Sequence, residues 1–161
     1  MEKEPIEKYM RMAIALSEQN VTQNLGGPFG AVIVKDGEVI SATANRVISE
    51  NDPTAHAEIS AIRLACKKLA TYDLSGCEIY TSCEPCPMCM GAIYWARINK
   101  IYYANTKTDA AHIGFDDNLI YQELKCDMAQ RKVRFEQVLH DEALTVFKLW
   151  ETSGENNNKN S

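Results

Sequence analysis

The sequence contains no hydrophobic run long enough to cross a lipid bilayer, which takes about 20 apolar residues in a helix. Its 161 residues are 45% hydrophobic and 24% charged, as in ordinary globular proteins. A chain of this length suffices for one hydrophobic core and is short for two. We therefore expect one domain over residues 1–150, followed by a polar tail over residues 151–161 that is disordered at its end.

The first residues also lack the features of a secretory signal. The segment from Met1 to Pro5 has neither a cationic start nor an apolar stretch, which predicts a cytoplasmic protein. Cytosolic proteins seldom contain disulfides. We therefore expect the six cysteines to be divided between metal ligands and buried thiols.

An excess of basic charge is missing as well. The net charge is −5 and the pI is near 5.2. A protein that holds a nucleic-acid backbone needs a large basic surface. The composition therefore argues against a nucleic-acid partner.

The sequence does contain one strong motif, between Pro53 and Cys89. It reads His-x-Glu at residues 56–58 and Pro-Cys-Pro-Met-Cys at residues 85–89. This is the arrangement of zinc-dependent nucleobase deaminases, H-x-E followed by P-C-x-x-C. The predicted ligands of one zinc ion are His56, Cys86 and Cys89, because a spacing of three lets both thiolates reach the same ion.

The number of ligands decides what kind of zinc site this is. A structural site has four protein ligands, whereas a catalytic site has three and keeps a position for water. Cys83 lies three residues before Cys86 and is a candidate fourth ligand, which would make the site structural. We favour a catalytic site, because Glu58 has no role in a structural one and because Pro85-Cys86 matches the deaminase motif.

Glu58 is the predicted proton carrier of this site. Two thiolates and a neutral imidazole cancel the charge of Zn²⁺, so water there needs a base. Glu58 can take a proton from water as the water attacks a ring carbon that bears an amine, and can return it to the ring nitrogen or to the leaving ammonia. The motif therefore predicts hydrolytic deamination of an aromatic base.

Hydrophobic patterns place the motif in an alternation of helices and strands. We predict a hairpin of residues 31–34 and 38–40 and strands at residues 78–81, 100–104 and 133–138. We predict helices over residues 5–20, 52–70, 88–96 and 141–150, the second of them with Asp52 as N-cap and Pro53 as first residue. His56 and Glu58 then lie in the first turns of one helix, and the two cysteine ligands lie at the start of another, where the helix dipole favours thiolates. The order predicts an α/β fold with helices on both faces of a mixed sheet.

Several residues outside the motif are candidates for substrate contact. Asn45 is explained more simply by a backbone turn, and Phe29 by packing in the core. Trp95 could either pack in the core or form the wall of a pocket. Residues 105–117 are expected to form a long loop that ends in a pair of acids, and a loop of this length suggests a functional reason.

These segments resemble the cytidine and deoxycytidylate deaminase superfamily, and within it the guanine deaminases of bacteria. The likeness extends from Gly26 to Trp150 and is found in four blocks: GGPFGAVIVKDG (26–37), NDPTAHAE (51–58), YTSCEPCPMCMGAIYWAR (80–97) and TDAAHIGFDD (108–117). The first three blocks have relatives across the superfamily, and the second is close to its form in tRNA adenosine deaminases. The IYWAR and GFDD sequences favour guanine as the substrate.

The resemblance implies a fold and a set of site residues. The fold is a three-layer α-β-α sandwich around a mixed five-stranded sheet, and one zinc ion per subunit is held by His56, Cys86 and Cys89, with Glu58 as the catalytic proton shuttle. The purine is contacted by three residues, through a hydrogen bond from Asn45, stacking near Phe29 and a pocket wall at Trp95.

The resemblance also implies a second catalytic residue and an assembly. Asp117 lies near the amine as acceptor or second proton carrier, although a helix cap before residues 118–121 explains it as well. The implied reaction converts the free base guanine, attacked at C2, to xanthine and ammonia. The implied assembly is a homodimer with exchanged C-terminal segments that cover the partner's pocket, although the tail after Trp150 is rich in Asn and has no aromatic residue.

Two kinds of alternative stay open at this point. A tRNA adenosine deaminase, or a deaminase of cytosine or another amino-heterocycle, shares the zinc chemistry, but the tRNA enzyme must also hold a polyanion. A zinc-stabilised binding module with Cys83 as fourth ligand is not an enzyme at all. Ammonia release separates these alternatives, whereas metal content does not.

Overall fold

The computed structural model describes residues 3–153. Contacts group the chain into an N-terminal unit that ends at Asp117 and a C-terminal unit that begins at Asn118. Among the described residues, no helix combines the length and the hydrophobicity needed to cross a bilayer. The single domain predicted for residues 1–150 stays a prediction, and the predicted disorder of the tail falls on residues 154–161, outside the described residues.

The N-terminal unit is built around a mixed four-stranded sheet with the strand order β2-β1-β3-β4. Its strands are β1 (Gly30–Lys35), β2 (Glu38–Ala44), β3 (Cys77–Cys83) and β4 (Lys100–Asn105). β1 pairs antiparallel with β2 and β3, whereas β3 and β4 are parallel. The predicted hairpin is confirmed: it turns at Asp36 and Gly37, which both have positive φ, as the favoured two-residue turns require.

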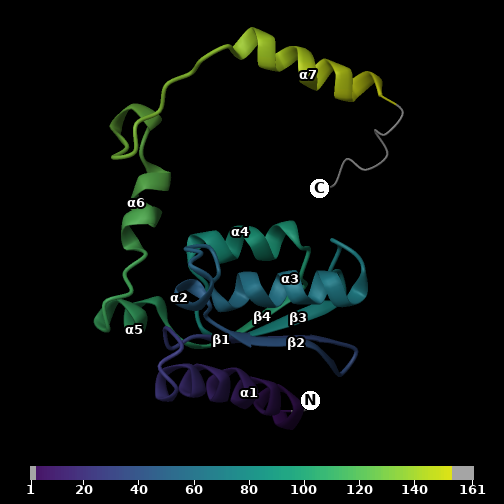
Figure 1. Cartoon of the computed structure of the whole chain (residues 1–161), viewed down its shortest axis with the longest axis vertical. Helices are drawn as coiled ribbons and strands as arrows, with labels where there is room; N and C mark the ends of the chain where they lie inside the picture. The colour runs from purple at the N-terminus through teal and green to yellow at the C-terminus, as the bar shows by residue number, and fades with distance from the viewer. Residues whose placement is uncertain (1–2, 154–161) are drawn as a thin grey trace. The chain divides into compact units, whose positions relative to one another are not determined.

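Helices cover both faces of this sheet (Figure 1). α1 (Lys3–Thr22) lies on one face, and α3 (Ala57–Leu69) and α4 (Pro87–Trp95) lie on the other. Alternate residues of β1 serve the two core layers: Val32 and Val34 pack with α1, and Ala31 and Ile33 pack with α3 and α4. The predicted α/β class and three-layer arrangement are confirmed.

The helix with the His-x-Glu motif begins later than predicted. Asp52 and Pro53 do not start it, because α3 begins at Ala57 with His56 as its N-cap residue. The Asp52 carboxylate instead accepts hydrogen bonds from the Thr54 N–H and hydroxyl, at 2.8 and 2.7 Å. This local turn competes with helix formation, and it follows a short helix, α2 (Val47–Glu50).

The long loop predicted for residues 105–117 was also wrong, because α5 (Lys107–His112) lies within it. A capping box starts this helix: Thr106 Oγ1 accepts from the Asp109 N–H, and the Asp109 carboxylate accepts from the Thr106 N–H. Thr-x-x-Asp is a variant of the sequence signal for a helix start. The segment is therefore ordered by its own side chains before it reaches Asp117.

The five-stranded sheet is a further error, since the sheet of the described residues has four strands. The C-terminal unit contains α6 (Asn118–Lys125), a 3-10 turn (Met128–Gln130) and α7 (His140–Thr152), which confirms the last predicted helix. The predicted fifth strand, residues 133–138, has no regular structure. Val133, Phe135 and Val138 are 73%, 53% and 67% exposed. Their alternating pattern suits a strand, but a strand forms only where a neighbour accepts its hydrogen bonds.

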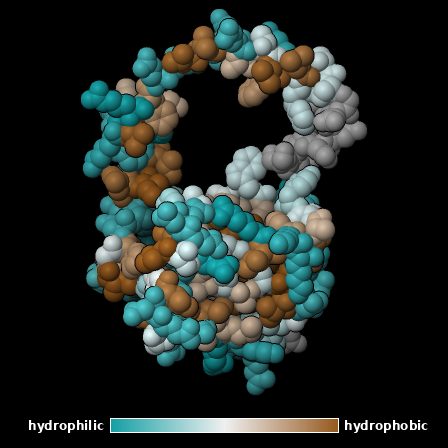
Figure 2. Space-filling view, viewed as in Figure 1, coloured by the Kyte–Doolittle hydropathy of each residue, from teal (hydrophilic) through white to brown (hydrophobic). Residues whose placement is uncertain are grey.

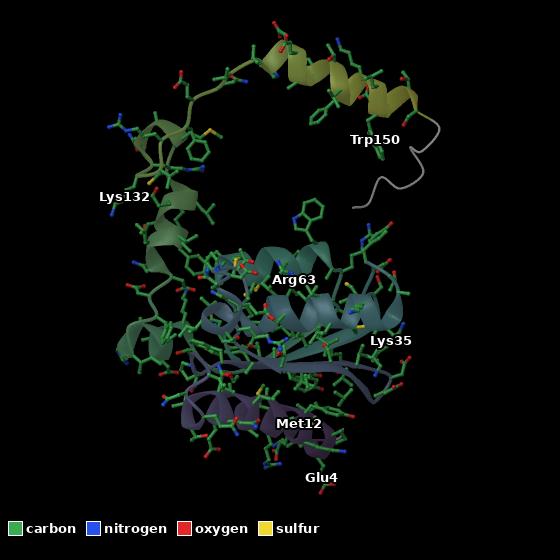
Figure 3. All side chains as sticks on the ribbon, in the orientation of Figure 1. Glu4, Met12, Lys35, Arg63, Lys132 and Trp150 are labelled. Atoms are coloured by element: carbon green, nitrogen blue, oxygen red, sulfur yellow. The ribbon has the colours of Figure 1, made fainter. Side chains whose placement is uncertain are left out.

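The C-terminal unit also exposes the hydrophobic residues of its last helix. Figure 2 shows hydrophobic residues at the surface of this unit, and Figure 3 shows the side chain of Trp150 projecting from α7. The residues concerned on α7 are Leu144, Val146, Phe147, Leu149 and Trp150. Such an exposed apolar surface is typical of a segment that packs against a partner.

Candidate active site

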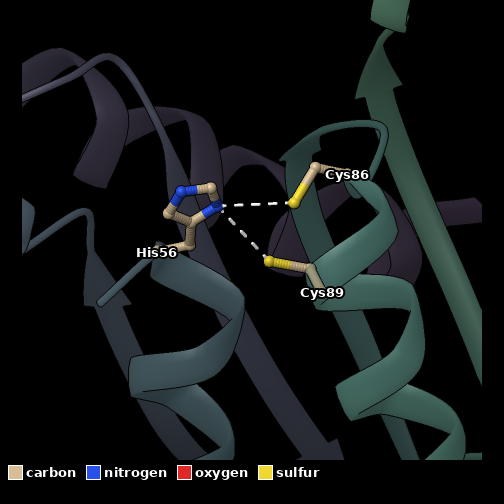
Figure 4. Close-up of side chains that lie close together, drawn as sticks. All are labelled: His56, Cys86 and Cys89. Atoms are coloured by element: carbon tan, nitrogen blue, oxygen red, sulfur yellow. Dashed lines mark hydrogen bonds between the residues drawn. The ribbon is translucent and has the colours of Figure 1, made fainter. Parts of the chain in front are cut away.

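Three metal-binding side chains come together at the N-terminal ends of two helices (Figure 4). His56 is the N-cap residue of α3, Cys86 is the N-cap residue of α4, and Cys89 lies in the first turn of α4. Pro87 follows Cys86 at the start of α4, where the missing N–H of proline is not needed. The predicted convergence of two helix starts is present in the structure.

The spacing of these side chains fits a zinc ion. His56 Nδ1 lies 3.5 Å from Cys86 Sγ and 3.6 Å from Cys89 Sγ, and all three ligand atoms lie within 4.8 Å of one another. Tetrahedral zinc, with bonds of about 2.3 Å to sulfur and about 2.0 Å to nitrogen, places its nitrogen and sulfur ligands about 3.5 Å apart. The two thiols and the imidazole therefore match zinc in kind and in distance.

Electrostatics prepare Cys86 to be a ligand. The hydrogen bond from Cys89 and the one from His56 lower the pKa of Cys86 to about 4, against the cost of burial. The pKa of His56 is raised, chiefly by the same hydrogen bond to Cys86. Cys86 is therefore a thiolate at neutral pH, and metal binding would displace the protons held by the other two groups.

Glu58 lies beside the ligands and is nearly inaccessible to solvent. It is in the first turn of α3, is 6% exposed and lies within hydrogen-bonding reach of the Cys89 thiol. Burial raises the pKa of its carboxyl group. A carboxyl group with a raised pKa can hold a proton and release it again near neutral pH, as a proton carrier must.

Cys83 stays outside this group. Its thiol lies 3.6 Å from the carbonyl oxygen of Thr106, and burial raises its pKa to about 11, so the thiol is neutral. Among the described residues, the potential ligands that gather at one point are His56, Cys86 and Cys89. The arrangement favours three protein ligands, the number typical of a catalytic site.

Asn45 and Phe29 are neighbours in the structure. The Asn45 N–H donates to the Phe29 carbonyl oxygen at 3.0 Å, and Asn45 Oδ1 accepts from the Val47 N–H at 3.1 Å. The Phe29 ring meets the ring of Phe115 edge to face, with centroids 4.9 Å apart. Phe115 was not singled out from the sequence, although it belongs to the GFDD block that favours guanine.

Asp117 and Trp95 have different surroundings. Burial raises the pKa of Asp117, and the negative charge of Cys86 raises it further, so Asp117 shares the electrostatic environment of the ligands. It also directly precedes α6, as a cap would. Trp95 is 71% exposed and lies at the far end of α4 from the ligands. Within its own chain it is therefore a surface residue.

A protein family has the same arrangement of residues. The model of the cytidine and deoxycytidylate deaminase zinc-binding region matches residues 3–105. The chain belongs to this family. Zinc binding is part of the family definition, so the predicted cofactor is confirmed, and His56, Cys86 and Cys89 form the matching site of this deaminase.

The family member from Bacillus subtilis (strain 168) called guanine deaminase is similar to this chain over nearly its whole length. The two sequences are 52% identical over 144 residues, which are 89% of this chain and 92% of the relative. The X-ray structure of Bacillus subtilis guanine deaminase has a TM-score of 0.90 and 49% identity, and the match covers 96% of this chain and 97% of that chain.

Two other relatives match a smaller share of the deaminase chain. The tRNA-specific adenosine deaminase of Agrobacterium fabrum is 51% identical over 76 residues, which are 47% of this chain and 50% of the relative. A solved structure in complex with 2,6-diaminopurine has a TM-score of 0.66 and 40% identity, covering 70% of this chain and 62% of that chain. Each of these matches therefore leaves a large part of this chain, of the relative or of both unaligned.

Proposed function

We propose that this protein is a zinc-dependent guanine deaminase, which hydrolyses guanine to xanthine and ammonia. The main observation is the three-ligand centre with buried Glu58 beside it. This centre lies in a chain that is similar to a guanine deaminase over 89% of its length. Three ligands and a nearby carboxylate are what hydrolytic deamination requires.

In this proposal the three ligands and Glu58 have separate tasks. His56, Cys86 and Cys89 would hold the zinc ion, which would supply the Lewis acidity that activates water for attack. Glu58 accepts a proton from water as the water oxygen bonds to C2 of guanine, and passes it to the ring nitrogen. Glu58 then takes the remaining proton of the C2 hydroxyl and delivers it to the amine, so that the bond from C2 to nitrogen breaks, ammonia leaves and the oxygen becomes the C2 carbonyl of xanthine.

We propose that Asn45 and Phe29 recognise the base. The Val47 N–H occupies Asn45 Oδ1, which orients the amide and leaves Nδ2 as a donor. Guanine offers acceptors at O6 and N7 as well as at its ring nitrogen N3. The half-buried Phe29 ring, fixed by Phe115, offers a flat surface for stacking. The bound purine in a solved relative supports a free base as the ligand.

We propose that Asp117 is the second proton carrier or an acceptor for the amine. The effect of Cys86 on its pKa supports a position near the ligands, and its raised pKa suits proton transfer. The competing role is that of a cap for α6. Because Asn caps a helix as well as Asp does, substitution by Asn separates the two roles.

We also propose a homodimer in which the C-terminal segments are exchanged. Strand β4 is one of the two edge strands of the sheet, and residues 133–138 carry a strand pattern without being a strand. If residues 133–138 of a second chain pair with β4 as a strand, the hydrogen-bonding groups of the edge and of the added segment are both satisfied. Exchange of a segment is a common route to dimers. A cavity of ≈ 240 Å³ beside the start of β4, lined by Ile93, Ile98 and Ile101 among others, offers a place for apolar side chains of the partner. Trp95 would reach a pocket only in such an assembly.

We propose that the protein is cytoplasmic. All six cysteines are free, including the partly exposed Cys66 and Cys126. Free thiols are typical of a reducing compartment, whereas secreted proteins usually pair them.

A substrate panel tests the proposed function. The protein is incubated with guanine, adenine, cytosine, their nucleosides and tRNA, and ammonia and the deaminated product are measured. We expect release from guanine and formation of xanthine. Release from adenosine in tRNA but not from guanine would favour the tRNA enzyme, although a net charge of −5 suits a tRNA substrate poorly. Release from no compound would favour a binding module.

A further inference from the structure

Asn20 is a buried polar residue outside the zinc centre. It lies in the last turn of α1 and is 4% exposed. Burying an amide is unfavourable unless it forms hydrogen bonds, so buried amides are nearly always bonded. The partners of Asn20 therefore indicate what it does.

The hydrogen bonds of Asn20 connect α1 to two later segments. Its Nδ2 donates to the carbonyl oxygens of Gly27, at 2.7 Å, and Asn45, at 3.0 Å. Its backbone oxygen accepts from the Leu25 N–H at 2.9 Å and the Gly26 N–H at 3.3 Å. One residue thus fixes both the glycine-rich segment before β1 and the residue that follows β2.

These bonds close a ring around the two proposed base-contacting residues. The Phe29 N–H donates to the same Gly27 oxygen at 2.9 Å, and the Asn45 N–H donates to the Phe29 oxygen at 3.0 Å. Asn20 completes the ring, since it donates to both Gly27 and Asn45. The zinc ligands are on α3 and α4, so they take no part in this ring.

Gly26 leaves the space that this ring needs. A Cβ atom at residue 26 would lie 3.1 Å from Asn20 Nδ2 and 3.2 Å from the Asn45 carbonyl oxygen. Both distances are shorter than ordinary carbon contacts, so a side chain there would push the donor and its acceptor apart. The φ of Gly26 is outside the left-handed region, so alanine is conformationally allowed there.

We propose that Asn20 is a positioning residue that sets the placement of the Phe29 ring against the Asn45 amide, and so determines how tightly the base is held. The proposal rests on the proposed function, because it takes both residues as contacts of the base. A loss of uniform binding raises KM and leaves kcat unchanged. We therefore expect changes at Asn20 to act on KM.

The test is Asn20→Asp in the full-length, zinc-loaded protein. This change keeps the size of the side chain but places a carboxylate oxygen against two carbonyl oxygens. We expect the KM for guanine to rise by about tenfold, the effect of losing about 1.4 kcal/mol of binding, and kcat to change by less than about twofold. Zinc content should stay at the wild-type value. The control is Asn24→Asp, which makes the same change at an exposed residue nearby and should leave KM unchanged.

A second pair of variants decides the matter if Asn20→Asp does not fold. Gly26→Ala disturbs the same contacts without burying a charge, and we expect a smaller rise of KM, about threefold. Its control is Gly91→Ala, because a Cβ atom at residue 91 meets open space. If Asn20→Asp folds and binds zinc, a wild-type KM in this variant would overturn the proposal. If it does not fold, a wild-type KM in Gly26→Ala would overturn it. A lower kcat at unchanged KM would also overturn it, because a purely structural role reduces the fraction of active protein and not the affinity for the base.

Failure of this proposal is distinct from failure of the proposed function. The wild-type protein alone decides whether guanine is deaminated. If guanine is turned over and the variants keep its KM, only the role of Asn20 is wrong. If another amino-heterocycle is the substrate, guanine deamination is wrong, and the same KM comparison with that substrate still decides the role of Asn20.

Discussion

The N-terminal unit buries its hydrophobic residues, whereas the C-terminal unit leaves those of its last helix exposed. Ala31, Val32 and Ile33 of the central strand are fully buried, while Phe147 and Leu149 of α7 are 72% and 67% exposed. Burial of apolar surface is the main stabilising contribution to folding. The first unit therefore has a buried core that positions the site, whereas the exposed residues of the second agree with the proposed contact to a partner. The comparison supports the proposal that the first unit carries the chemistry and the second the assembly.

Among the changes that compare the two units, the largest expected effect is in the metal centre, where two cysteines are contrasted. Cys89→Ser removes a ligand, and we expect it to lower zinc content and to reduce activity by at least about a hundredfold, since even indirect support of a ligand is worth 10–100-fold. Cys83→Ser is the matched control, because its thiol faces Thr106 and not the ion. Zinc content and turnover are measured on both variants. Equal loss of zinc in both would make the site structural.

A smaller effect is expected at the boundary between the units. Asp117→Asn should reduce kcat by about a hundredfold if the carboxylate transfers a proton, because general acid–base catalysis is worth about 10²–10⁴-fold. Thermal stability should stay unchanged, since Asn is as good a helix cap. Guanine turnover and melting temperature are measured together. Unchanged kinetics would assign Asp117 to capping alone.

If the C-terminal unit mediates assembly, a substitution in this unit should lower the mass of the protein in solution. Phe147→Glu places a charge in the exposed apolar face of α7, and we expect it to weaken the dimer by about 2 kcal/mol or more, as at central interface residues. Light scattering or sedimentation over a range of concentrations measures the effect. Lys148→Glu places the same residue at a neighbouring exposed position and should leave the dimer intact. If the wild-type protein is monomeric at all concentrations, the proposed role of the C-terminal unit in assembly is wrong.

The smallest expected effect concerns the cap of α5. Thr106→Ala removes the N-cap oxygen and should lower the free energy of unfolding by about 1 kcal/mol. Hydrogen bonds to Thr106 lower the pKa of Asp109 from its ordinary value of 3.8. Its stabilising effect is therefore present above pH 3.8 and lost as the pH falls below it. Unfolding of Asp109→Asn followed across this range should differ from wild type at neutral pH and converge with it in acid.

Short-range patterns predicted most of the N-terminal unit. The hairpin at Asp36 and Gly37, the alternation of helices and strands, and the convergence of His56 with Cys86 all follow from neighbouring residues or from a fixed motif. The start of α3 could not be predicted in this way, because Asp52 has two competing uses and its turn with Thr54 prevails. The five-stranded sheet failed because a strand depends on its neighbour and not only on its own pattern.

Contacts between distant residues were the hardest part of the site to predict. Asn20 looks like an ordinary residue near the end of a helix, and its bond to Asn45 joins residues 25 positions apart. The pairing of Phe29 with Phe115 is more distant still in the sequence. The zinc ligands were found because their motif is local in two short pieces, whereas the residues that we propose to position the base are joined only by the fold.

The most direct test of the central claim is Glu58→Gln, with zinc content and guanine turnover measured on the same sample. The substitution keeps the shape of the buried side chain but removes its ability to carry a proton. We predict wild-type zinc content and a loss of turnover by about a thousandfold, while Glu38→Gln, at an exposed position, should change neither. Turnover near the wild-type value in zinc-loaded Glu58→Gln would contradict the account.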